Sequence, residues 1–177
     1  MREFIVKARA APVDPMRFGE GIGKPPHVEF LAQMLVNGLF VAKGHREDTC
    51  IHFVLESSPD FSRVLTFDGG SLGSLGGLDE RAVLAAFVEA LVAGVALGRD
   101  QGLISPAGVS VRACSFEQLV KEKAEVGSLF LLERRGAPAS TCAAAAHPVF
   151  VLTDQAPLPR KLDKWLQRLG ATPVSLG

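Results

Sequence analysis

The pair Cys50 and His52 is the first arrangement in the sequence that could do chemistry. The two residues are separated by one position within the apolar run 49–56 (TCIHFVLE), so an extended chain places both side chains on one face. A zinc site needs two further ligands, and the three other histidines lie elsewhere in the chain. We therefore predict a buried thiol beside a hydrogen-bonded histidine, and no metal site.

Two glycine-rich segments invite a phosphate-binding interpretation. The first is Gly19-x-Gly21-x-Gly23-Lys24, but a P-loop needs Ser or Thr after its lysine to hold magnesium, and here Pro25 follows. The second, residues 69–77 (GGSLGSLGG), contains no lysine and is typical of a flexible loop. The G-x-S-x-G motif of hydrolases is also absent. Neither a P-loop nor a serine-hydrolase site is expected.

The most informative local feature follows the apolar run 148–153 (PVFVLT). This predicted strand ends at Thr153-Asp154 and continues into two prolines before a helix, which favours a rigid pocket lip. Ligands of parallel sheets bind outside the carboxyl ends of the strands. The cluster 44–48 (GHRED) is consistent with either a second pocket rim or a solvated turn.

The charges balance overall but are unevenly distributed. Nineteen basic and nineteen acidic residues give a formal net charge of zero, which argues against a protein that coats nucleic acid by bulk charge. Residues 45–100 hold nine acidic and four basic side chains, whereas residues 157–177 hold four basic and one acidic. The basic C-terminal end is consistent with a phosphate-binding surface or with an ordinary solvated helix face.

Alternating strands and helices would have to position these residues. The strands are continuously apolar, which is typical of a mostly parallel sheet with helices on both faces, the α/β class. Helices are predicted to begin near His27, Asp79, Ser115 and Pro159. Residues 11–26 and 69–77 are expected to be loops. The predicted strands are residues 2–8, 49–56, 62–68, 108–112, 128–133, 148–153 and 172–176.

Length and composition are those of an ordinary globular domain. The 177 residues suggest one domain, and three widely spaced cysteines suit a reducing compartment, so a cytoplasmic protein is expected. The first ten residues carry four charges and do not resemble a signal peptide. Residues 82–97 are too short for a membrane span and contain Glu89, so we predict a core helix and no membrane segment.

An ordered set of segments resembles the tRNA pseudouridine N1-methyltransferase family of the SPOUT superfamily, and most closely its bacterial branch. The matching segments extend along nearly the whole chain. They are MREFIVKA, HVEFLAQMLVNGLFVAKGHRED, GVSVRACSFEQLVKEK, SLFLLERRG and PVFVLTDQAPLPRKLDKWLQRLG followed by VSLG.

The resemblance implies a single SPOUT-like domain over residues 1–177, with a trefoil-knotted cofactor-binding region at 128–177. It also implies a homodimer, bound S-adenosylmethionine and a tRNA substrate, with no metal. The family continues beyond the turn that ends at Gly177, so these residues are expected to leave the knot incomplete. The implied cofactor-binding residues are Leu132, Gly136, Thr153, Ser175, Leu176 and Gly177, and the implied RNA-binding residues are Arg2, Arg46 and Arg112.

The implied reaction transfers a methyl group to N1 of a pseudouridine. The proton that N1 carries must leave as this nitrogen is methylated. Asp48 and Asp154 are the candidate proton acceptors, and a water molecule is an alternative. A second hypothesis is a non-catalytic RNA-binding or dimeric remnant of the fold with a truncated cofactor site. A third, an α/β enzyme that acts on another small molecule, has no motif in its favour.

Overall fold

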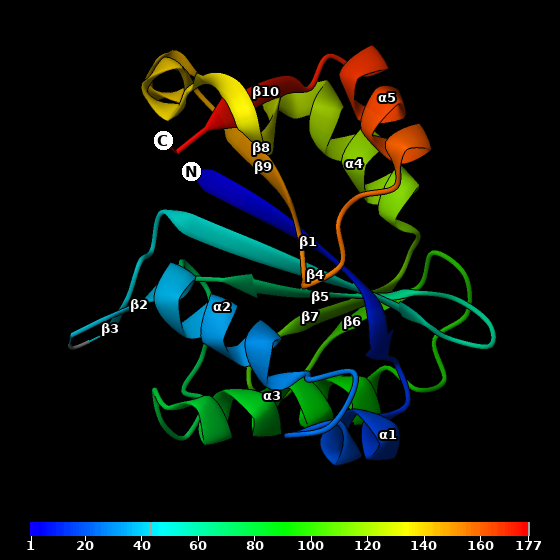
Figure 1. Cartoon of the computed structure of the whole chain (residues 1–177). Helices are drawn as coiled ribbons and strands as arrows, with labels where there is room; N and C mark the ends of the chain where they lie inside the picture. The colour runs from blue at the N-terminus through cyan, green and yellow to red at the C-terminus, as the bar shows by residue number, and fades with distance from the viewer. Residues whose placement is uncertain (43, 177) are drawn as a thin grey trace.

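A computed structural model describes residues 1–42 and 44–176 and contains one large mixed sheet (Figure 1). The strand order is β10-β8-β9-β1-β4-β5-β7-β6, and a separate two-stranded hairpin joins β2 to β3. The strands are β1 (Arg2–Pro12), β2 (Phe40–Val41), β3 (Gly44–His45), β4 (Thr49–Ser57), β5 (Arg63–Asp68), β6 (Gly102–Ile104), β7 (Ser110–Ala113), β8 (Ser128–Pro138), β9 (Pro148–Thr153) and β10 (Thr172–Ser175).

The five strands β10, β8, β9, β1 and β4 are mutually parallel, whereas β5, β7 and β6 continue the sheet by antiparallel pairing. β1 lies between β9 and β4, with Lys7 opposite Thr153 on one side and Val54 on the other. The carboxyl ends of β9, β1 and β4 therefore meet at one edge. This arrangement confirms the predicted α/β class and its mostly parallel sheet.

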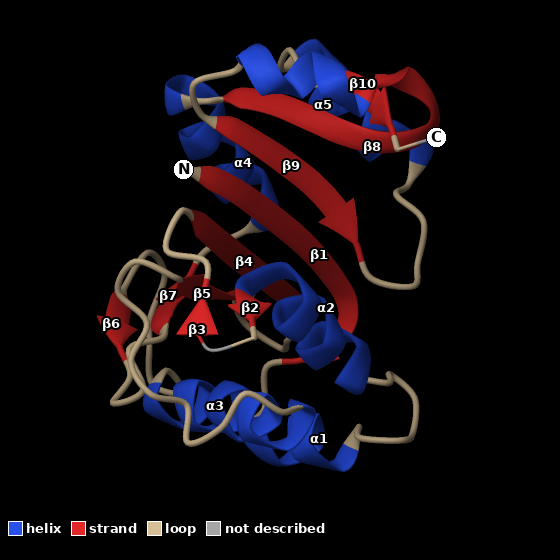
Figure 2. Ribbon diagram, turned by 90° about the vertical axis from the view of Figure 1, so that its left-hand side faces the viewer, coloured by secondary structure: helices blue, strands red, loops and turns tan. Residues whose placement is uncertain are grey.

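Helices cover both faces of the sheet (Figures 1 and 2). On one face, α1 (Pro15–Glu20), α2 (Glu29–Leu39) and α3 (Glu80–Ala93) enclose the larger core. Phe53 of β4 and Phe67 of β5 pack there edge to face, with ring centroids 5.9 Å apart. On the other face, α4 (Phe116–Val126) and α5 (Arg160–Arg168) pack over β8, β9 and β1. Each helix thus buries one apolar stripe against the sheet.

The helix boundaries follow local signals in the sequence. The Asp79 carboxylate accepts a hydrogen bond from the Ala82 amide at the start of α3, and the Ser115 hydroxyl accepts one from the Gln118 amide at the start of α4. Gly170 has a positive φ of 92° immediately after α5, which suits glycine after a helix end. No helix within residues 1–42 and 44–176 is long and apolar enough to cross a membrane.

Several elements differ from the sequence prediction. The expected loop 11–26 contains α1, and the hairpin β2–β3 and the edge strand β6 were not predicted. β8 also continues to Pro138 instead of ending near residue 133, because its second half pairs with β10 and places Ala137 opposite Val174. These elements are short or acquire their strand geometry from a distant partner, so hydrophobic periodicity does not reveal them.

Candidate cofactor and RNA site

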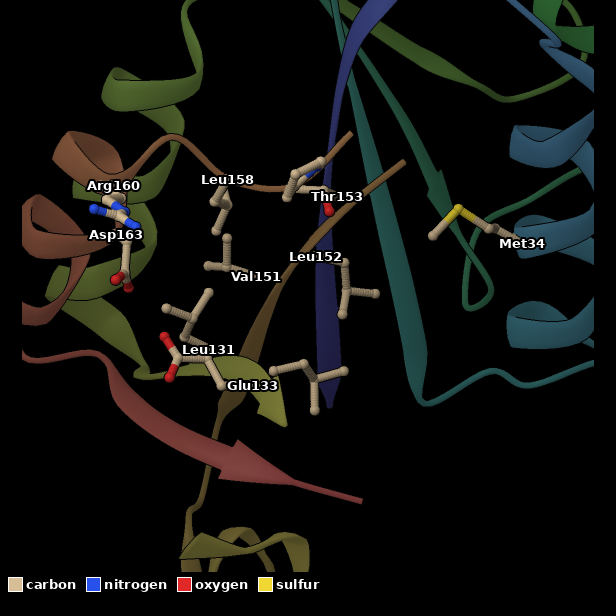
Figure 3. Close-up of a pocket in the computed structure, with 11 residues that line it drawn as sticks. Met34, Leu131, Glu133, Val151, Leu152, Thr153, Leu158, Arg160 and Asp163 are labelled. Carbon is tan, nitrogen blue, oxygen red and sulfur yellow. The ribbon is translucent and has the colours of Figure 1, made fainter. Parts of the chain in front are cut away.

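A pocket of about 490 Å³ lies at the carboxyl ends of β8 and β9 (Figure 3). β8 and β9 form its floor, the loop that follows β9 and helix α5 form one side, and Met34 of α2 reaches it from the other side. Parallel sheets bind ligands at this edge, so the location matches the prediction from the sequence. The lining residues are Met34, Leu131, Leu132, Glu133, Val151, Leu152, Thr153, Pro157, Leu158, Arg160 and Asp163.

The pocket has apolar walls and one charged end. Leucine and valine side chains of β8 and β9, together with Leu158, make the walls, whereas Glu133, Asp163 and Arg160 lie toward α5 (Figure 3). Desolvation and the adjacent Asp163 carboxylate, which is hydrogen-bonded to it, raise the pKa of Glu133. The two carboxyl groups are therefore close enough to compete for one proton.

The loop after β9 is fixed at both ends. The Asp154 amide donates to the Lys7 carbonyl of β1 at 3.3 Å, and the Asp154 carboxylate accepts from the Ala156 amide at 3.0 Å. Pro157 and Pro159 then restrict the backbone until α5 begins at Arg160. The lip predicted from the sequence is therefore present, and Asp154 lies in it beside Thr153.

The six predicted cofactor-binding residues occupy different environments. Leu132 and Thr153 line the pocket. Gly136 instead faces the backbone of Val174, because a Cβ atom at this position would lie 2.4 Å from it. The Ser175 hydroxyl donates to the Arg134 carbonyl at 3.3 Å, and Leu176 is 80% exposed. Gly177 lies outside the described residues.

The two candidate proton acceptors lie at opposite ends of the sheet. Asp48 precedes Thr49, which pairs with Arg2 at the start of β1, whereas Asp154 follows Thr153, which pairs with Lys7. Seven strand residues at about 3.3 Å each separate the two levels by about 20 Å. Two hydrogen bonds from Arg2, at 2.9 and 3.0 Å, hold the Asp48 carboxylate and lower its pKa. One chain therefore does not bring the two aspartates together.

The three predicted RNA-binding arginines all have partners within the chain. Arg2 is paired with Asp48. Arg46 donates to the carbonyls of Asn37, Gly38 and Phe40 at the end of α2, at 3.1, 2.7 and 3.4 Å. Arg112 donates to Glu122 at 2.6 Å and to the Cys114 sulfur at 2.8 Å. Each guanidinium thus has a structural role that the sequence did not indicate.

Other basic side chains lie on β8 and α5, the elements that form the pocket, and have no acidic partner among the described residues. These residues are exposed. We call them the C-terminal basic set, and they are Arg134, Arg135, Lys161, Lys164 and Arg168. Their positive charge is therefore available to a ligand in solution.

Cys50 and His52 belong to a separate buried network on the α4 side of the sheet. The Glu3 carboxylate accepts hydrogen bonds from His52 at 2.8 Å and from Lys123 at 2.5 Å, while Nδ1 of His52 meets the Thr66 hydroxyl at 2.8 Å. The His52 hydrogen bond and Lys123 lower the Glu3 pKa to about 2, and burial lowers the pKa of His52. Burial raises the pKa of Cys50 to about 12, which disfavours the nucleophilic thiolate form.

Three potential metal ligands come together in this network. Ligand atoms of Glu3, Cys50 and His52 lie within 4.8 Å of one another. The Glu3 carboxylate, however, already contacts the Lys123 ammonium, and both ring nitrogens of His52 have hydrogen-bond partners. The arrangement matches the predicted buried thiol beside a hydrogen-bonded histidine.

Of the eleven residues that line the pocket, sequence reasoning named Leu132 and Thr153 and missed the others, among them Met34, Arg160 and Asp163. Met34 reads as part of an apolar helix stripe, and Arg160 and Asp163 read as part of a basic end that suits either a phosphate-binding surface or a solvated helix face. Nothing in the local pattern shows that α2 and the start of α5 approach the same end of β9. The prolines before α5 were the available signal, because they fix where that helix begins.

The fold is an α/β domain with a pocket at the carboxyl ends of parallel strands. The family described as "Putative SAM-dependent RNA methyltransferase" matches residues 1–177. The chain therefore belongs to this family of S-adenosylmethionine-dependent RNA methyltransferases.

Relatives support this assignment. A "Putative pseudouridine methyltransferase" of Vibrio atlanticus is 42% identical over 177 residues, which is the whole chain and 89% of the relative. A protein of the same name from Vibrio cholerae is 41% identical and is covered to 88%. The crystal structure of Archaeoglobus fulgidus Nep1 bound to S-adenosylhomocysteine matches with a TM-score of 0.57 at 10% identity, over 100% of this chain and 89% of that one. This last match supports the fold.

Proposed function

We propose that this protein transfers a methyl group from S-adenosylmethionine to N1 of a pseudouridine in tRNA. The observation that carries the proposal is the pocket at the carboxyl edge of β8 and β9, in a chain whose family is one of SAM-dependent RNA methyltransferases. The pseudouridine substrate is supported by the names of relatives about 42% identical over the whole chain.

The pocket fits the cofactor in size and chemistry. Its volume of about 490 Å³ lies within the range of about 300–1,000 Å³ typical of small-molecule sites. Leu132 and the other apolar side chains of the walls suit an adenine ring, and Thr153 is placed to fix the ligand at the end of β9. Bound there, S-adenosylmethionine supplies an electrophilic methyl carbon. We propose that residues 128–177 bind the cofactor and that this region forms the trefoil knot.

Asp154 is the better placed of the two candidate proton acceptors. It lies in the pocket lip, and its backbone amide is tied to β1 by the Lys7 carbonyl. Asp48 is about 20 Å away along the strands and is held by Arg2, so it would reach a site only from a second copy of the chain. In the proposed homodimer, the amino-terminal sheet edge of the partner would therefore supply Asp48 and complete the site.

The RNA surface is the next part of the proposal. The C-terminal basic set lies on β8 and α5, the elements that form the pocket, and its charges are not neutralised by neighbours. Phosphate contacts provide much of the affinity for RNA, so free cations next to the cofactor pocket would bring the substrate to it. Arg2, Arg46 and Arg112 remain a second set of proposed RNA-binding residues, although each already has a hydrogen-bond partner within the chain. A cytoplasmic location, where tRNA is modified, agrees with three free cysteines.

Methyl transfer is the direct test. Purified protein is incubated with labelled S-adenosylmethionine and two tRNA transcripts, one with pseudouridine and one with uridine at the same positions. We expect label only in the first transcript, and mass spectrometry of its nucleosides would show N1-methylpseudouridine. Binding of S-adenosylhomocysteine without transfer to either RNA would refute the proposed substrate. Absence of both binding and transfer would favour the non-catalytic remnant.

Charge substitutions test the RNA surface separately. The variant Lys161→Gln/Lys164→Gln should weaken tRNA binding and reduce its dependence on salt by about two phosphate contacts. Arg81→Gln on α3 is the matched control, because this exposed arginine lies on the opposite face of the sheet. An unchanged salt slope in the lysine variant would place the RNA elsewhere.

A further inference from the structure

The charged end of the cofactor pocket contains groups of both signs that do not neutralise one another. Glu133 comes from β8, and Arg160 and Asp163 come from the first turn of α5. Within residues 1–42 and 44–176, none of the three forms an ion pair. Figure 3 shows the Glu133 and Asp163 carboxyl groups on the same side of the pocket as Arg160. The pocket thus offers two carboxylates and a guanidinium, side by side, beyond its apolar walls.

This arrangement is costly unless a ligand compensates it. Two carboxyl groups in hydrogen-bond contact repel when both are ionised, which agrees with the raised pKa of Glu133. The Asp163 carboxylate also accepts from Gln167 at 3.1 Å, which fixes its position on α5. A cation placed between the two carboxylates would relieve the repulsion, and an anion beside it would pair with Arg160.

We propose that Glu133, Asp163 and Arg160 form the subsite for the zwitterionic amino-acid end of the cofactor, with its ammonium against the two carboxylates and its carboxylate against the guanidinium. The apolar walls of β8 and β9 then receive the adenine ring at the other end of the same cavity. This inference rests on the proposed function and adds the orientation of the cofactor within the site. Glu133, Asp163 and Arg160 are binding residues that set this orientation and take no part in proton transfer.

The chemistry of two related nucleosides makes the inference testable. S-Adenosylhomocysteine carries the amino-acid end, whereas 5′-methylthioadenosine has the same adenine, ribose and thioether without it. A subsite for the zwitterion must therefore change the ratio of the two affinities and leave the affinity for 5′-methylthioadenosine unchanged. Isothermal titration calorimetry on the full chain measures both dissociation constants.

Two variants remove opposite halves of the subsite. Glu133→Gln/Asp163→Asn removes the negative charges while keeping the shape of both side chains, and Arg160→Gln removes the positive charge from an exposed position. Each should weaken S-adenosylhomocysteine binding by about ten- to a hundredfold, as expected for lost hydrogen bonds to charged groups. Binding of 5′-methylthioadenosine should change less than about twofold, within the ordinary effect of a surface substitution. Glu125→Gln on α4 and Arg81→Gln on α3 are the matched controls, and both should bind like the parent.

The outcomes separate the inference from the proposed function. If both nucleosides bind the parent protein and the variants weaken both equally, the carboxylates hold the ribose hydroxyls and the inference is wrong. If the affinity ratio is unchanged in both variants, the amino-acid end lies elsewhere and the inference is also wrong. In either case the cofactor still binds, so the proposed function stands. If neither nucleoside binds the parent protein, the proposed function itself fails.

Discussion

The substitution Gly136→Ala tests where this glycine is needed. An added Cβ would lie 2.4 Å from the backbone nitrogen, Cα and carbonyl carbon of Val174, whereas ordinary contacts begin near 3.4 Å. Because backbone atoms of a paired strand cannot rotate away, β8 and β10 must separate by about 1 Å, and overpacking of this kind costs about 1–3 kcal/mol. Val174 is fully buried, so its packing is lost together with the strand pairing.

Urea denaturation measures this cost as a fall in the free energy of unfolding at constant m-value. Gly19→Ala is the matched control, because nothing lies within 4 Å of its added Cβ and alanine in α1 gains about 0.5–1 kcal/mol of helix stability. If Gly136 instead served close approach of the cofactor, Gly136→Ala would keep its stability and lose only affinity for S-adenosylhomocysteine. Unfolding free energies within about 0.5 kcal/mol of the parent would therefore refute the strand-packing argument.

Four further substitutions test the buried network, the end of α2 and the two aspartates. The Glu3 pKa is about 2 in the folded chain and about 4.5 when unfolded, so stability is expected to fall by about 2 kcal/mol as the pH drops from about 5 to 2. Glu3→Gln should flatten this dependence, and urea titrations at several pH values would show it. Arg46→Ala removes hydrogen bonds to three carbonyls at the end of α2 and should lower stability by about 1–2 kcal/mol. A lower tRNA affinity at unchanged melting temperature would contradict that role. Asp154→Asn keeps the turn but removes the proposed proton acceptor and should lower kcat by about a hundredfold or more. Asp48→Asn should have an equal effect only if the site spans two chains, in which case mixing the two variants would restore activity.

Much of the fold was predictable because its main elements carry their signals locally. The apolar runs of β4, β5 and β9 are continuous, and Asp79 and Ser115 mark the starts of α3 and α4. The second half of β8 was not predictable, because Arg134 to Pro138 contain no strand pattern and become a strand through pairing with β10. Local sequence specifies a strand only where the strand also buries a regular face.

The location of the candidate site at the end of β9 was predictable from the sequence, but most of its other residues were not. Thr153 and the prolines that follow mark the end of β9, and the general location of ligands in parallel sheets supplies the remainder of the argument. The roles of charged side chains could not be predicted in this way. Arg46 and Arg160 look alike in the sequence, yet one donates to the carbonyls at the end of α2 and the other lines the pocket. The difference depends on which groups the chain brings within about 3 Å.

The distribution of paired and unpaired charges distinguishes the two ends of the sheet. At the amino end of β1 and β4, Arg2 and Asp48 form an ion pair, so neither side chain needs a ligand to balance its charge. At the carboxyl end of β8 and β9, Glu133, Asp163 and Arg160 line one cavity without pairing among the described residues. Glu133 and Asp163 are partly buried next to each other, so their like charges repel, whereas Arg160 is exposed. A ligand with charges of both signs, as in the proposed subsite, would pair with all three groups. For Asp48 of a second copy to contribute to the site, the Arg2–Asp48 ion pair of that copy would have to open as the copy docks.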